Sequence, residues 1–377
     1  MLIRSSQTRN CMLTLFFLLT IFFIWMDVNL YIRIHDYPIR DNEKRLLNSS
    51  AVLKPTVPVA VASYETSSIS LGQPVSTVRY DDVTWVSCDL NPLCDVTAKA
   101  MILDHVNHYL FAPMVTIADN LVGISRGNLI TPNMISIFHV FVAIASGRMI
   151  ASDSLSYRRI GVVLFEFRTF LDDLDGHVAR DKKHVHGERS DIGSLGFYID
   201  AICDVLGVIA LMIGVFIFLT NNLPRTGYTQ LQSIIPTTKK SKSSFTHVNY
   251  NLNATTREVV QKVSCYSAIW VLSGLTWNRY IAIYQDVLER EDVTPTEFLH
   301  QESVFRSIGF FVICWVWRMF NVHALLHFLL LSIFCDKLWE YLRMVQYAGL
   351  VMLLVIISVT EMHFLKVKQF ICKSVTV

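Results

Sequence analysis

Charged residues are scarce in this sequence. Asp, Glu, Lys and Arg make up only 17% of its 377 residues, whereas hydrophobic residues make up 52%. That balance is unusual for a soluble globular domain and typical of a membrane protein. The net charge of +2 is spread along the chain. Because no long basic block is present, we expect no binding to nucleic acid.

The sequence also lacks a regular cysteine pattern. Its eight cysteines are scattered, without the paired spacings of a zinc site or of a disulfide framework. Cys88 and Cys94 are the exception, because they lie six residues apart around an Asn-Pro pair. They would close a small disulfide loop if this segment is lumenal. Two free thiols in a loop are the alternative.

Seven apolar stretches approach or exceed the length of about 20 residues that a membrane-spanning helix needs. They are Met12 to Ile32, Ile130 to Ala151, Ile160 to Leu171, Phe197 to Leu219, Val263 to Ile283, Ile308 to Phe334 and Val345 to Phe364. The sequence therefore predicts an all-α polytopic membrane protein with about seven transmembrane helices. The first is an uncleaved anchor, because no small-residue cleavage site follows it. The third carries Glu166 and Arg168, which must face protein or a polar cavity.

These stretches divide the chain into four predicted parts. They are a cytoplasmic amino terminus with the anchor helix (1–32), a long lumenal segment with helices on the membrane surface (33–129), a six-helix core (130–365) and a lumenal tail (366–377). The orientation rests on the short loops, which carry more Lys and Arg on the side of the amino terminus. Four basic residues close after the first stretch argue the other way. In this orientation the sequon residue Asn48 is a lumenal glycosylation candidate.

Four aspartates stand out in the segment FLDDLDGHVARDKKHVHGERSDIGSLGFYIDAICDVLG. Asp172 and Asp175 lie three residues apart, and Asp200 and Asp204 lie four apart, so each pair occupies one face of a helix. Two successive helices therefore present two carboxylates each at the same membrane surface.

Four converging carboxylates need positive charge between them, because charge near a bilayer is unfavourable. Two divalent cations would balance them, and oxygen ligands favour Mg²⁺ or Mn²⁺ over zinc. Such a pair suits phosphoryl transfer. One alternative is that the acids pair with basic residues on a solvated loop. Another is a metal-ion transporter, for which we expect internal repeats and interrupted helices that the sequence does not clearly show.

The motif around these acids resembles that of the CDP-alcohol phosphotransferases. All eight of its fixed positions are matched, by Asp172, Asp175, Gly176, Ala179, Arg180, Gly196, Asp200 and Asp204. The resemblance covers about residues 130–364 and implies a six-helix core with a CDP-alcohol site. It further implies that relatives pair through their membrane helices, so that a homodimer in the lipid bilayer is expected.

The resemblance also implies roles for individual residues. Asp172, Asp175 and Asp200 would be metal ligands, and Asp204 would be the general base and a further metal neighbour. Gly176, Ala179 and Gly196 would line the cytidine site. Asn133 and Arg180 would contact the nucleotide phosphates.

One departure from the motif is informative. The fifteen residues 181–195 separate Arg180 from Gly196, more than in most members of the family. This spacer, the anchor helix and the long lumenal segment are similar to those of the ceramide phosphoethanolamine synthases of invertebrates. That resemblance implies CDP-ethanolamine as donor, ceramide as acceptor, Mn²⁺ in preference to Mg²⁺, and an active site facing the Golgi lumen. The alternative is an ethanolamine- or cholinephosphotransferase acting on diacylglycerol.

Overall fold

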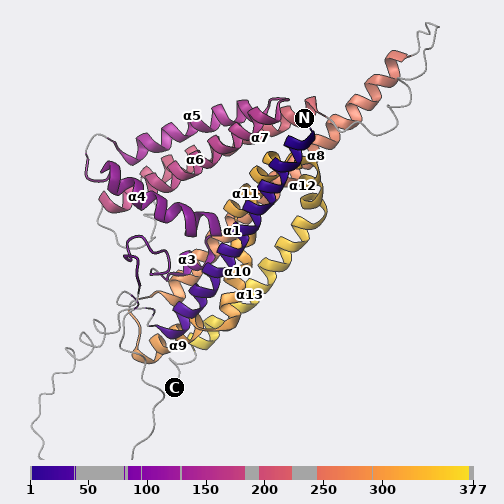
Figure 1. Cartoon of the computed structure of the whole chain (residues 1–377). Coiled ribbons are helices and arrows are strands. Elements are labelled where there is room, and N and C mark those ends of the chain that lie inside the picture. Colours follow the sequence, from indigo (N-terminus) through magenta and orange to yellow (C-terminus); the bar gives the residue numbers. More distant parts are fainter. Residues whose placement is uncertain are drawn as a thin grey trace, which may run out of the picture.

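The computed structural model describes residues 2–37, 39, 80, 84–94, 96–127, 130–182, 195–222, 244–290 and 292–372. All regular elements of these residues are helices, as predicted (Figure 1). They are α1 (Leu2–Asp36), α3 (Ala98–Ile102), the π-helix η2 (Asn107–Phe111), α4 (Ala112–Val122), α5 (Pro132–Ile150), α6 (Leu155–Lys182), α7 (Leu195–Asn221), α8 (Ser244–Leu288), α9 (Pro295–Phe305), α10 (Ile308–Phe320), α11 (Val322–Phe334), α12 (Leu338–Met344), the π-helix η3 (Val345–Gly349) and α13 (Leu350–Cys372).

Several helices begin at residues whose side chains cap free backbone N–H groups. Thr131 accepts a hydrogen bond from the third residue of α5, and Pro132 occupies the first position, where its missing N–H has no effect. At α9, Thr294 and Glu297 form a reciprocal capping box. Asn321 caps α11 and thereby separates it from α10. Local sequence therefore fixes where these helices start.

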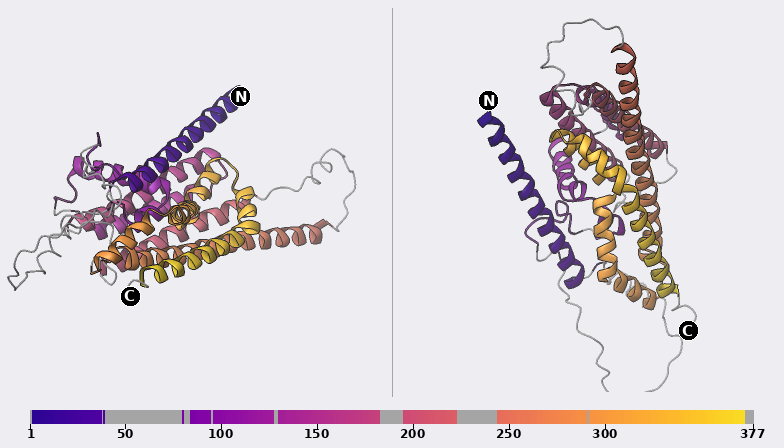
Figure 2. Two further views of the ribbon diagram at one scale, coloured as in Figure 1. Left: turned by 90° about the horizontal axis from the view of Figure 1, so that it is seen from below. Right: turned by 90° about the vertical axis from the view of Figure 1, so that its right-hand side faces the viewer.

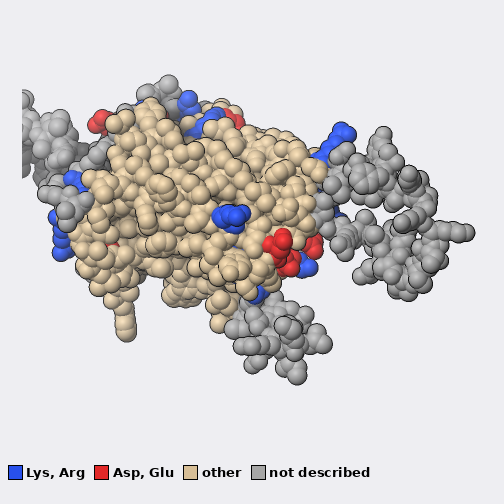
Figure 3. All heavy atoms as spheres, turned by 90° about the horizontal axis from the view of Figure 1, so that it is seen from above, with Lys and Arg blue, Asp and Glu red and all other residues tan. Residues whose placement is uncertain are grey.

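Four described stretches are long and apolar enough to cross a membrane. A bent pair, Pro295–Phe305 with Ile308–Phe320, would make a fifth span, with an angle of 54° between its helices. The four are Thr14–Asp36, Pro132–Ile150, Tyr198–Asn221 and Leu338–Ile371. Figure 3 shows a broad face on which charged side chains are sparse. The chain is thus a multi-pass membrane protein, and the count of seven spans stays a prediction.

The helices form two groups that cross at an angle. α5, α6 and α7 lie side by side, and α8, α10, α11 and α13 form the second group, with α1 along its flank (Figures 1 and 2). α5 packs against both α6 and α7. The amino terminus and the carboxyl-terminal end of α13 lie at opposite ends of the molecule (Figure 1), which agrees with an odd number of crossings.

Small residues bring the backbones of α5, α6 and α7 together. A Cβ placed on Gly214 of α7 would lie 2.3 Å from the carbonyl oxygen of Gly147 of α5. A Cβ on Gly161 of α6 would lie 3.0 Å from the carbonyl oxygen of Ser146, whose hydroxyl donates a 2.7 Å hydrogen bond to the Gly161 carbonyl. Close approach at small residues is a common way to pack helices in lipid. These contacts set the spacing of the two helices that carry the aspartates.

The predicted boundaries shift at two places. The anchor helix continues to Asp36, and α13 continues to Cys372, beyond the predicted ends at residues 32 and 365. In the segment 33–129, Met101 and Ile102 of α3 are at most 1% exposed within the core, and the expected helices on the membrane surface stay a prediction. The α3 sequence AKAMI is apolar on most sides, so burial inside the protein is favourable. The division into four parts otherwise stays a prediction.

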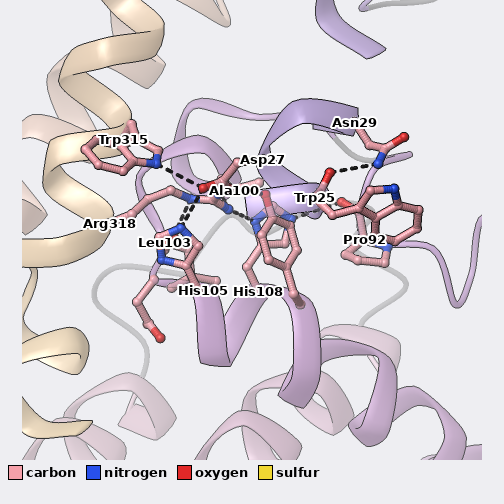
Figure 4. Close-up of polar contacts among 12 residues, drawn as sticks. Trp25, Asp27, Asn29, Pro92, Ala100, Leu103, His105, His108, Trp315 and Arg318 are labelled. Carbon is pink, nitrogen blue, oxygen red and sulfur yellow. Dashed lines mark hydrogen bonds and ion pairs between the residues drawn. The ribbon is translucent and has the colours of Figure 1, made fainter. Parts of the chain in front are cut away.

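A buried polar network joins α1 to the core (Figure 4). Asp27 of α1 accepts a 2.5 Å hydrogen bond from Arg318 of α10, and bonds of 2.8 to 3.0 Å from His105, Tyr109 and Trp315. Both charged side chains are buried, Asp27 being 7% and Arg318 2% exposed. α1 is therefore an integral part of the fold in addition to being a predicted anchor.

Candidate functional site

The two aspartate pairs meet between α5, α6 and α7. One carboxylate oxygen from each of Asp172, Asp175 and Asp200, together with one ring nitrogen of His139, all lie within 4.8 Å of one another. Three of the four predicted acids therefore converge, as the helical spacing implied. His139 comes from α5, which crosses the faces of α6 and α7 that carry the acids.

Asp204 lies at the edge of this group. Its Oδ1 is 4.0 Å from His139 Nε2, and it forms an ion pair with Arg168. Arg168 also lies 3.6 Å from Asp172 Oδ2 and is buried. The side chain of Asp204 is 38% exposed, compared with 14% for Asp172. Asp204 is therefore more accessible to a second reactant than Asp172.

The distances within the group suit a shared divalent cation. His139 Nε2 lies 3.6 Å from Asp172 Oδ1 and 3.9 Å from Asp175 Oδ2, both longer than a hydrogen bond. Atoms that ligate one octahedral ion at about 2.1 Å lie about 3 Å apart when adjacent and about 4.2 Å apart when opposite. The two spacings from His139 fall between those values.

The hydrogen bonding of the group leads to the same conclusion. Among the described residues, neither ring nitrogen of His139 nor Oδ1 of Asp200 has a hydrogen-bond partner, although these atoms are buried. Buried polar atoms normally have partners. Three carboxylates with one imidazole form a donor set for a hard divalent cation. The cluster can therefore hold a metal ion.

Two residues of this site were not predicted from the sequence. Ser136 Oγ donates a 2.7 Å hydrogen bond to Asp175 Oδ2, and His139 completes the cluster. Together with Asn133 they recur at intervals of three residues along a predicted apolar span. Polar residues repeated on one face of a membrane helix indicate a polar environment, so this spacing was an available signal. Arg168, by contrast, was expected to face protein and does so.

The predicted nucleotide-binding residues lie around the cluster. The Nη1 atom of Arg180 lies 3.3 Å from the position of a Cβ on Gly176, and Asn133 Oδ1 lies 3.5 Å from that of a Cβ on Gly196. The two glycines thus each have a predicted phosphate-binding side chain beside them. Ala179 is half-buried on α6 between these positions.

Two further predicted features lie elsewhere. Cys88 and Cys94 form a disulfide, which closes a small loop before α3. Asn48 lies outside the described residues, so its glycosylation stays a prediction.

The comparisons with known proteins agree with this site. A family model described as ceramide phosphoethanolamine synthase matches residues 1–374. The chain is also 50% identical to a ceramide phosphoethanolamine synthase of Drosophila melanogaster over 389 residues, which cover 98% of this chain and 97% of the relative. No solved structure is significantly similar to it.

Proposed function

We propose that this chain, which belongs to the ceramide phosphoethanolamine synthase family, transfers phosphoethanolamine from CDP-ethanolamine to the primary hydroxyl of ceramide. It is an enzyme of the CDP-alcohol phosphotransferase type. The observation that carries the proposal is the convergence of the motif residues Asp172, Asp175 and Asp200 with His139 of α5. The acceptor and the head group come from the relatives' names.

In the proposed reaction, Asp204 acts as the general base. The primary hydroxyl oxygen of ceramide forms a bond to the β-phosphorus of the donor, and the bond from this phosphorus to the CMP oxygen breaks. The hydroxyl proton passes to a carboxylate oxygen of Asp204, and CMP leaves. The exposed position of Asp204 beside the cluster supports this role.

The neighbouring side chains hold the acids in place. Arg168 pairs with Asp204 and lies near Asp172, so that it orients both carboxylates and offsets their charge. Ser136 fixes one oxygen of Asp175. The places of Gly176 and Gly196 beside Arg180 and Asn133 support their proposed contacts with the nucleotide.

We further propose that two divalent cations, Mn²⁺ in preference to Mg²⁺, serve this reaction. His139, Asp172, Asp175 and Asp200 would hold one ion, and Asp204 with a carboxylate of the cluster would contact the other. When bound, such ions neutralise phosphate oxygens and stabilise the attacking and leaving groups.

The proposed location is the Golgi membrane with the active site facing the lumen. The Cys88–Cys94 disulfide supports a lumenal position, since disulfides persist in oxidising compartments. The disulfide loop and α6 border the same pocket, so the site lies on the side of the disulfide. A homodimer stays a prediction.

The test uses purified full-length protein in lipid nanodiscs with labelled CDP-ethanolamine. Ceramide or diacylglycerol is supplied as acceptor, with Mn²⁺, Mg²⁺ or a chelator. We expect product with ceramide that depends on the metal. If product forms with diacylglycerol but not with ceramide, the proposed acceptor is wrong. If turnover continues in the presence of chelator, the proposed metal requirement is wrong.

Asp204→Asn tests the proposed base. It should lower kcat by about 100-fold or more while inhibition by CMP is retained. The matched control is Asp286→Asn, which changes an exposed carboxylate on α8. If Asp204→Asn keeps full turnover, another group must accept the proton.

A further inference from the structure

α6 carries two polar faces, and the proposed reaction uses only Arg180 of the second. Successive helical residues are turned by about 100° around the axis, and the centres of the two faces lie about 140° apart. The first face holds Arg168, Asp172, Asp175 and Ala179 toward the metal cluster. The second face holds Glu166, Asp173, His177 and Arg180.

The second face of α6 lines a pocket of about 320 Å³. The opposite walls come from the disulfide loop, the π-helix η2 and α4, which all belong to the long segment before the core. The lining is mixed in charge, with carboxylates from Asp89, Asp173 and Asp181 and a guanidinium from Arg180. The pocket therefore suits a ligand that carries both positive and negative charge.

The wall opposite α6 is held in place by the network of Figure 4. The ring Nε2 of His108 lies 3.0 Å from the carbonyl oxygen of Pro92 in the disulfide loop, and Nδ1 of the same ring contacts Arg318. Arg318 is in turn paired with Asp27 of α1. The disulfide closes the same loop. A wall fixed at so many points is preorganised for binding.

Gly176 lies on α6 between the face that carries the metal cluster and the face that lines the pocket. By helix geometry it lies about 40° from Asp172 and about 60° from Asp173 around the axis. It has no side chain there, and an added Cβ would meet Arg180 Nη1 at 3.3 Å. The P–O–C–C–N arm of a phosphoethanolamine group spans about 5 Å at ordinary bond lengths. A phosphate on the first face could thus place its amine on the second.

We propose that this pocket takes the ethanolamine end of the donor and that Asp173 accepts hydrogen bonds from its primary ammonium group. This inference rests on the proposed function. A primary ammonium has three N–H donors and needs acceptors such as carboxylates. A quaternary ammonium has no such donors and is usually held by aromatic rings, and no Phe, Tyr or Trp is among the described residues that line the pocket. Asp173 is therefore a specificity-determining residue for a primary amine.

The test compares Asp173→Asn with the unchanged protein, using CDP-ethanolamine and CDP-choline as donors and ceramide as acceptor. We expect kcat/KM for CDP-ethanolamine to fall about 10- to 100-fold, as for loss of a charge-assisted hydrogen bond. The kcat/KM for CDP-choline should fall much less, so the ratio of kcat/KM between CDP-ethanolamine and CDP-choline should decrease. Inhibition by CMP, which lacks the ethanolamine ammonium group, should be unchanged. Asp173→Glu should restore part of the preference.

The outcomes separate the two proposals. If the unchanged protein does not use CDP-ethanolamine, the proposed function itself is wrong. If it does, and Asp173→Asn keeps the original preference, only the assignment of this pocket is wrong. Loss of CMP inhibition in Asp173→Asn would also overturn the assignment, because the residue would then act on the whole site. Asp286→Asn serves as the control and should match the unchanged protein in all three measurements.

Discussion

Replacing Asp27 with leucine removes the carboxylate that holds α1 against α10. In the structure this carboxylate receives four side-chain hydrogen bonds, including one from the guanidinium of Arg318. Arg318 is 2% exposed, so the substitution leaves a positive charge buried without its carboxylate partner. Breaking a buried ion pair on one side costs about 3–5 kcal/mol. We expect a loss of that size in the free energy of unfolding.

Substituting the partner residue, Arg318→Met, should lower the free energy of unfolding by a similar amount, because Asp27 then remains charged and buried. The double variant removes both charges together. A buried pair replaced by apolar groups is often close to neutral, so the double variant should be more stable than the sum of the single losses predicts. The single losses sum to about 6–10 kcal/mol. Because the double variant still leaves His105, Tyr109 and Trp315 without their bonds to Asp27, we expect a coupling free energy of at least about 3 kcal/mol.

The assay is equilibrium unfolding of the purified protein in detergent or nanodiscs, followed by tryptophan fluorescence. Trp315 donates to Asp27 and so reports on the network directly. Lys337→Ala is the control, because Lys337 and Glu340 form an exposed pair, with side chains 67% and 54% exposed. Breaking it should cost at most about 1 kcal/mol. Single variants as stable as the control, or strictly additive losses, would refute the reasoning.

Two further predictions concern the metal cluster and the packing beneath it. His139→Ala should raise the Mn²⁺ concentration for half-maximal activity by about ten-fold or more, since even indirect partners of a metal change its affinity 10- to 100-fold. A Mn²⁺ titration followed by calorimetry and by turnover checks this prediction. An unchanged titration would exclude His139 as a ligand. Gly214→Leu should destabilise the protein by about 1–3 kcal/mol or more, because its Cβ would lie 2.3 Å from the carbonyl oxygen of Gly147. Gly274→Ala, which meets only ordinary contacts, is the comparison in the same unfolding assay, and equal stability of the two variants would contradict the packing argument.

The aspartate pairs could be predicted because their spacing is a local property. Residues three or four apart share a helix face wherever the helix lies, so Asp172, Asp175 and Asp200 were expected to converge, and they do. His139 was missed because it belongs to another helix. Which face α5 turns toward the acids depends on its glycine contacts with α6 and α7, and these contacts are not visible in the sequence of α5 alone.

The burial of α3 and of η2 in the core was not predicted for a related reason. The polar residues Asp104 and His108 have partners from the far end of the chain. His108 contacts Arg318, and His327 lies 3.6 Å from Asp104. Pairing across more than two hundred residues has no local sequence signal. The pocket along the second face of α6 could not be predicted either, because it exists only where the segment before the core and α6 meet.

The pairing of Asp27 with Arg318 also sets the order of events during synthesis. The two residues are 291 positions apart, which at 5–20 residues per second corresponds to about 15–60 s of translation. During this interval the first helix has already entered the membrane, and its carboxylate has no guanidinium to pair with. The amino-terminal helix therefore stays loosely associated, or bound to the insertion machinery, until α10 has been synthesised. The contact between the first helix and α10 thus forms only after most of the chain has been synthesised.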